Sequence, residues 1–159
     1  MLAVRPATGA DHDAIWAILK PVFRAGDTYT IDPAIPRADA LAYWTAHRCY
    51  VAEDAGDVLG TYYLKPNQQG GGAHVANCGY ATLPAARGRG IASAMCAHSL
   101  DAARAAGFRA MQFNFVVSTN TGAIRLWEKH GFDTVGRLPR AFDHPGSGEV
   151  DALVMHRFL

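Results

Sequence analysis

The stretch LPAARGRGIASAM, residues 83–95, joins an extended apolar run to a run with helical spacing. A helix that begins near residues 88–91 presents backbone N–H groups without intrahelical partners, together with the positive end of its dipole. Glycine lets the oxygen atoms of a ligand approach the backbone closely, and Arg87 and Arg89 add positive charge. The stretch predicts an anion site for a phosphate or pyrophosphate, and a plain glycine turn with solvated arginines is the alternative interpretation.

Two common phosphate-binding motifs do not fit this stretch. The lysine and the serine or threonine of a nucleoside-triphosphate loop are missing, because Ile91 and Ala92 follow Gly90. The dinucleotide fingerprint is matched only in part, and it lies mid-chain after a predicted hairpin rather than in a first strand–helix–strand unit. The stretch therefore gives little support for a nucleoside triphosphate or a dinucleotide as the ligand.

Outward from this stretch, extended runs and helical runs are mixed along the chain. Strands are predicted at LAVRP, CYVAED, VLGTYYL, HVANCGYATL, AMQFNFVV, FDTVG and VDALVMHRFL, and the segment RLPRAFDHPGSGE is expected to be a loop. Helices are predicted around residues 15–19, 38–46, 91–106 and 120–130. Hairpins combined with two strand–helix units predict the α+β class with a mixed sheet.

Composition and charge exclude several classes of protein. A chain of 159 residues, half of them apolar, fits one globular domain over residues 1–159. The net charge of +1 provides no broad field for nucleic acid or for a membrane surface, so neither is an expected partner. No apolar run approaches the ~20 residues of a membrane span, and the start MLAVRPATGADHD lacks the apolar core of a secretory signal.

The cysteines point to a reducing compartment. Cys49, Cys78 and Cys96 are odd in number and widely spaced, which favours reduced thiols in a cytoplasmic protein. No pair has the spacing of a zinc site, so no metal is expected. Whether the chain forms a homodimer is left open.

Two motifs resemble signatures of the GNAT acetyltransferase superfamily. Arg87-x-x-Gly90-x-Ala92 resembles its R/Q-x-x-G-x-G/A signature, and NTGAIRLWEKHGF, residues 120–132, resembles N-x-x-A-x-x-L-Y-x-x-x-G-F with Trp127 in place of tyrosine. The motifs have the expected order and separation, and the resemblance covers almost the whole chain. It implies a mixed sheet of about seven strands, splayed into a V, with helices on both faces and acetyl-CoA in the cleft.

The resemblance also implies how acetyl-CoA binds. Backbone N–H groups after Arg87 would hold the pyrophosphate, and an extended run would pair with the pantetheine arm like an added strand. Such a grip would also aim the thioester carbonyl at an incoming amine. The expected cofactor residues are Tyr80, Ala81, Thr82, Arg87, Gly88, Arg89, Gly90, Ile91, Ala92, Ser93, Asn120 and Trp127.

The tyrosine that often serves as the acid in this family is replaced by Trp127, whose indole N–H donates a hydrogen bond but has no useful acidity. We expect Trp127 to contact the sulfur end of the cofactor, with a plain core position as the alternative. Asn114 and Asn120 are catalytic candidates, because their amides could bond the sulfur or the thioester carbonyl. A helix N-cap is the alternative for Asn120, and buried hydrogen bonding is the alternative for Asn114.

The general base is not evident, because HVANCGYATL lacks the glutamate that the family often has in this strand. His74 is the candidate, since histidine exchanges protons near neutral pH, although an exposed strand-end residue is the plainer interpretation. The expected substrate-binding residues come from the strand and the two loops that flank the acceptor cleft in this fold: Asp27, Tyr29, Asn77, Phe142 and His144.

The predicted activity is N-acetylation of a small amine by acetyl-CoA. FNFVVSTNTGAIRLW and VDALVM resemble the azetidine-2-carboxylate acetyltransferase type, which implies a small amino acid or a proline-like secondary amine as acceptor. Acetylation of a peptide or protein, and a CoA-binding module without catalysis, are the alternatives.

Overall fold

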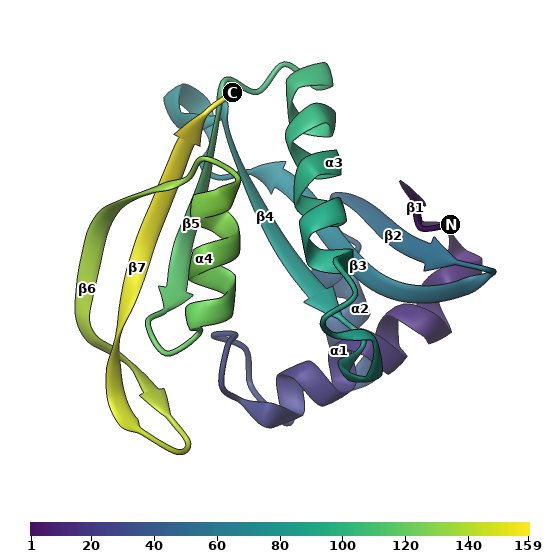
Figure 1. The fold of residues 1–159 in the computed structure, drawn as a ribbon, viewed down its shortest axis with the longest axis horizontal. Coiled ribbons are helices and arrows are strands. Elements are labelled where there is room, and N and C mark those ends of the chain that lie inside the picture. Colours follow the sequence, from purple (N-terminus) through teal and green to yellow (C-terminus); the bar gives the residue numbers. More distant parts are fainter.

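The computed structural model describes residues 1–159, which form one seven-stranded sheet with helices on both faces (Figure 1). The strands are β1 (Ala3–Pro6), β2 (Arg48–Asp54), β3 (Asp57–Pro66), β4 (Val75–Thr82), β5 (Ala110–Val117), β6 (Asp133–His144) and β7 (Gly148–Phe158). The α-helices are α1 (His12–Ala25), α2 (Arg37–Trp44), α3 (Ile91–Ala105) and α4 (Thr121–Lys129). The strand order is β1-β2-β3-β4-β5-β7-β6, and only β4 and β5 pair in parallel. The predicted α+β class with a mixed sheet is confirmed.

The helices cover the two faces of the sheet with two separate cores. Helices α1 and α2 bury residues such as Phe23 and Trp44 on one face, and helix α3 buries residues such as Met95 on the other. The cores stay separate because neighbouring strand residues point to opposite faces. In β3, Tyr62 joins the α3 side and Tyr63 joins the α1 side. None of the helices is long and apolar enough to cross a membrane.

Strands β4 and β5 diverge soon after they begin (Figure 1). Their ladder consists of Val75 opposite Ala110 and Ala76 opposite Met111. Just beyond it, Asn77 Nδ2 donates a 3.0 Å hydrogen bond to the carbonyl oxygen of Gln112. The Asn77 amide thereby binds the carbonyl oxygen of Gln112 that would otherwise accept the next backbone hydrogen bond of the β4–β5 ladder. The sheet opens into a V at this point, as the resemblance implied.

The last hairpin is longer than the sequence predicted. Residues 137–144 were expected in a loop because of their proline and polar residues, and that prediction is wrong, since β6 continues through them. Pro139 is tolerated because the β6–β7 register shifts between Leu138 and Phe142, and a bulge needs no ladder N–H at that position. Phe142 and His144 therefore lie on a strand.

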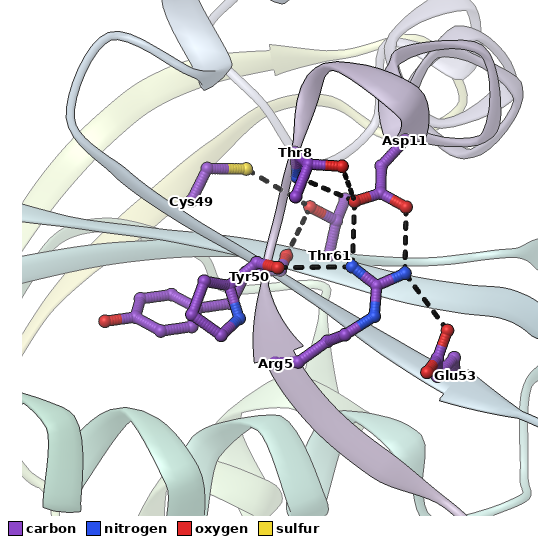
Figure 2. A network of polar contacts seen from close by, with 8 residues as sticks. Arg5, Thr8, Asp11, Cys49, Tyr50, Glu53 and Thr61 are labelled. Carbon is purple, nitrogen blue, oxygen red and sulfur yellow. Dashed lines mark hydrogen bonds and ion pairs between the residues drawn. The ribbon is translucent and has the colours of Figure 1, made fainter.

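A polar network ties the edge strand β1 to the start of α1 (Figure 2). Arg5 donates to both carboxylate oxygens of Asp11 at 2.9 Å and to Glu53 at 3.0 Å. Asp11 also accepts a 2.7 Å hydrogen bond from the Thr8 N–H, so it closes the turn that leads into the helix. The hydrogen bonds from Arg5 lower the pKa of Asp11 from 3.8 to about 2.

Candidate functional site

A cavity of about 710 Å³ opens where β4 and β5 diverge. Its walls include residues 77–82 of β4, residues 113–117 of β5, one side of α4 between residues 120 and 127, the start of α3 with the turn before it, and the segment 27–30 after α1. The predicted site residues that line it are Asp27, Tyr29, Asn77, Tyr80, Ala81, Thr82, Arg87, Gly88, Ala92, Asn114, Asn120 and Trp127. The V-shaped opening thus brings together residues from the middle of the chain and from both flanking parts.

The start of α3 forms one end of the cavity. Gly88 and Gly90 have φ angles of 78° and 76°, in the left-handed region that favours glycine, and Gly90 is the N-cap of α3. No hydrogen bond within the protein uses the N–H groups of residues 88–93. Six consecutive free donors, the helix dipole and the neighbouring Arg87 make this end of the cavity a binding site for an anion.

Three side chains of this segment have partners elsewhere. Arg89 pairs with Asp54 at 3.3 Å and does not line the cavity. The side chain of Ile91 is buried, and the Ser93 hydroxyl lies 2.9 Å from His130 Nε2 at the end of α4. These residues therefore offer an anion their backbone N–H groups, whereas Arg87 lines the cavity directly.

The middle of the cavity is the free edge of β4. Leu83 N–H donates to Leu59 of β3, and His74 accepts from Arg109, so odd-numbered residues face β3 and even-numbered residues face β5. Backbone groups of Cys78, Tyr80 and Thr82 consequently face the cleft. The Tyr80 carbonyl accepts a 2.6 Å hydrogen bond from the Tyr29 hydroxyl. An extended ligand can pair with this edge as an added strand does.

Trp127 forms the wall of the cavity on the α4 side. Its ring centroid lies 4.9 Å from those of Tyr80 and Phe113, and 8% of the residue is exposed. The indole N–H has no hydrogen-bond acceptor in the protein, and it is not fully buried. The hydroxyl of Tyr80 bonds to Ser99 at 2.6 Å, and burial raises the pKa of Tyr80 well above its usual value. This hydroxyl therefore stays protonated and fixes the strand to α3.

The two asparagines have different surroundings. Asn120 is the N-cap of α4, where its Oδ1 accepts from the Ala123 N–H at 3.4 Å, and its Nδ2 has no partner in the protein. Asn114 is exposed, accepts from Gln112 at 2.9 Å and donates to Asn67 at 2.6 Å. Asn114 thus connects β5 to the loop after β3 across the opening of the V.

The other end of the cavity contains residues that the sequence analysis missed. The ring of Tyr63 fills the space beside Gly79, where an added Cβ would lie 2.4 Å from Tyr63 Cε2. The hydroxyls of Tyr63 and Tyr43 are 3.3 Å apart, and Lys65 Nζ lies over both rings. The alternation of VLGTYYLK would have placed Tyr63 and Lys65 on one face, but nothing in that run indicates which face meets the cleft.

Besides Arg89, Gly90, Ile91 and Ser93 of the α3 start, three predicted catalytic or substrate-binding residues lie outside the lining of the cavity. His74 is an exposed residue that precedes β4. Phe142 packs behind the lining residue Phe115, with ring centroids 6.0 Å apart. His144 Nδ1 accepts from backbone N–H groups at the tip of the β6–β7 hairpin. The structure gathers no group of three or more metal-ligating side chains.

Comparison with known proteins agrees with this geometry. A GCN5-related N-acetyltransferase from Kribbella flavida is 44% identical, covers 99% of this chain and 98% of its own, and superposes with a TM-score of 0.96. A phosphinothricin acetyltransferase from Sinorhizobium meliloti, solved in complex with acetyl-CoA, has the same fold at 23% identity, with a TM-score of 0.88 over 99% of this chain and 88% of that one.

Curated relatives align over part of their length. The N-acetyltransferase aca1 of Schizosaccharomyces pombe is 37% identical over 98 residues, which are 61% of this chain and 47% of the relative. The chain therefore matches about half the length of this relative. Residues 13–132 match the model of the acetyltransferase (GNAT) family. With a match over most of its length, the chain belongs to the acetyltransferase (GNAT) family.

Proposed function

We propose that the chain, as a single domain over residues 1–159, transfers the acetyl group of acetyl-CoA to the amine of a small molecule. The observation that carries this proposal is the continuous cavity between β4 and β5. One end offers free N–H groups for a pyrophosphate, the middle offers a strand edge for an extended arm, and the other end offers aromatic and polar groups for a compact acceptor.

The residues present fit acetyl-CoA. The N–H groups of residues 88–93 and Arg87 would hold the pyrophosphate, and the even-numbered residues of β4 would hold the pantetheine arm. Acetyl-CoA supplies the activated acetyl group when bound. Asn120 Nδ2 and the indole N–H of Trp127 are donors without partners, and we assign them to the thioester end. A leaving thiol with a pKa of about 8.5 departs without a strong acid, so a hydrogen bond from the indole N–H of Trp127 suffices at this end of the cofactor.

Proton removal from the acceptor is assigned to water in the cavity. No histidine lines the cavity, and Asp27 is the one acidic residue that does. We therefore expect kcat/KM to rise with pH until the acceptor amine is deprotonated. His74, which lies outside the lining, is expected to tolerate replacement by alanine with little change in this profile.

The acceptor is proposed to be a small amino acid or a proline-like secondary amine, of the azetidine-2-carboxylate type. The support is the composition of the acceptor end, where aromatic rings and a few single polar groups surround a limited volume. The chain carries a net charge of +1, so no broad field attracts polyamines.

A thiol-release assay with acetyl-CoA tests the proposal. The acceptor panel contains azetidine-2-carboxylate, proline, other amino acids, polyamines, aminoglycosides and lysine peptides, and we expect a small amino acid to give the highest kcat/KM. Peptide turnover that exceeds every small amine by tenfold or more, about 1.4 kcal/mol in the transition state, would overturn the acceptor class. Calorimetric binding of acetyl-CoA without turnover of any acceptor would indicate a CoA-binding module.

A further inference from the structure

Lys65 is a cation at the acceptor end of the cavity that has no carboxylate partner. It lies near the end of β3 and lines the cavity, and no ion pair in the structure includes it. Its Nζ is 5.3 Å from the ring centroid of Tyr63 and 5.5 Å from that of Tyr43. Two aromatic rings hold the ammonium in place without neutralising its charge.

Hydrogen-bonding groups gather around this ammonium. Lys65 lies opposite Asn77 in the β3–β4 ladder, so both side chains project from the same face of the sheet. The hydroxyls of Tyr43 and Tyr63 are 3.3 Å apart beside it. Asn114 reaches the segment directly after β3 through its bond to Asn67. An anionic group that enters here meets the Lys65 ammonium beside two tyrosine hydroxyls.

The charged residues that line the cavity belong to two different parts of it. Arg87, Lys65 and Asp27 are its only charged residues, and Arg87 belongs to the anion site before α3. Asp27 lies two residues before Tyr29, whose ring packs against Trp44, which in turn packs against Tyr63. One cation and one carboxylate, both outside any ion pair, therefore remain for the acceptor.

We propose that Lys65 binds the carboxylate of an amino-acid acceptor and that Asp27 contacts its amine. Lys65 would then be the residue that makes the enzyme prefer an amino acid over the amine that lacks the carboxylate. The ammonium suits this task as a compact charge with three donors. This inference rests on the acetyl transfer proposed above.

Matched acceptors isolate the carboxylate. Azetidine-2-carboxylate is compared with azetidine, and proline is compared with pyrrolidine, so that only the carboxylate differs within each pair. Lys65→Met keeps an unbranched apolar stem and removes the charged end of the side chain, and Lys65→Arg keeps the charge. We expect Lys65→Met to raise KM for both amino acids by about 10-fold to 100-fold, as loss of a charge-assisted hydrogen bond predicts, with little change in kcat.

The same variant should leave KM for azetidine and pyrrolidine within about twofold of wild type, because these amines do not use Lys65. Lys65→Arg should recover most of the preference for the amino acids. Asp27→Asn should lower kcat/KM for both members of each pair equally, because it acts on the amine. An equal effect of Lys65→Met on both members, or no effect on either, would overturn the inference.

Binding measurements separate this inference from the proposed function. Calorimetry follows azetidine-2-carboxylate added to the complex of the protein with CoA, and acetyl-CoA affinity and Tm show that each variant is folded. One outcome is that the protein binds azetidine-2-carboxylate but transfers an acetyl group to no acceptor. If Lys65→Met then abolishes that binding, the carboxylate site is supported and the proposed function is refuted. Transfer to small amines with a carboxylate preference that survives Lys65→Met would refute the site and leave the proposed function intact.

Discussion

Replacement of Gly79 by alanine tests the packing that builds the acceptor end. The added Cβ would lie 2.4 Å from Cε2, 2.7 Å from Cζ and 2.8 Å from the hydroxyl oxygen of Tyr63. Carbon atoms in ordinary contact are about 3.5–4.0 Å apart, so the ring must move by roughly 1 Å or more. Tyr63 is 7% exposed, and its ring lies 4.9 Å from that of Trp44 in an edge contact. Because moving the ring disturbs its edge contacts with Tyr43 and Trp44, we expect Gly79→Ala to lower the free energy of unfolding by about 1–3 kcal/mol.

Urea unfolding in two backgrounds measures this effect. Tyr63→Leu removes the ring atoms that the new Cβ would meet, so Gly79→Ala should cost less than about 0.5 kcal/mol in that background. Gly71→Ala is the matched control, since an added Cβ there meets no atom within 4 Å. An equal loss in both backgrounds, or no loss in the wild-type background, would refute the reasoning. The displaced ring should also move Lys65, whose ammonium lies over it. KM for the acceptor should therefore rise while acetyl-CoA affinity stays unchanged.

Three further predictions concern the cofactor, the leaving group and pH. Gly90→Val forces a branched residue into a φ of 76°, a left-handed conformation that costs roughly 1–2 kcal/mol. Calorimetry should therefore show that acetyl-CoA binds more than about tenfold more weakly. Unchanged affinity would contradict the anion site. Trp127→Phe should retain activity within about tenfold, and a loss of about 100-fold or more at unchanged Tm would show that the indole acts in proton transfer. The pKa of Asp11 falls from 3.8 to about 2 in the folded protein, so its ion pair with Arg5 stabilises the fold fully above pH 3.8 and is lost as the pH falls through about 2. Asp11→Asn should therefore lower the Tm at pH 7, and the difference from wild type should close between about pH 4 and pH 2; a constant difference would contradict this account.

Features set by neighbouring residues could be predicted from the sequence. The turn before α3 depends on two glycines with positive φ and on a helix start, and both are properties of consecutive residues. Helix α4 likewise carries its own signals, with Asn120 as the N-cap and Gly131 in a left-handed conformation after its end. Together with the alternating apolar runs, these local signals determine the fold class.

The sequence was misleading where tertiary contacts override local preference. Pro139 and its polar neighbours favour a loop, yet pairing with β7 extends β6 through them, because a bulge accommodates the proline. Asn77 could be assigned to a strand from the sequence, but its bond to Gln112, at the point where β4 and β5 part, requires two strands that lie 35 residues apart in the chain.

The acceptor end was decided only by the tertiary structure. Tyr63 meets Gly79 because of the β3–β4 register, and Tyr43 joins them because α2 packs on that face of the sheet. A shift of one residue in that register would move Tyr63 and Lys65 to the opposite face. Local sequence determines backbone conformation and helix ends through short-range sterics and hydrogen bonds, whereas the set of side chains that meets a substrate depends on the register and packing of the whole sheet.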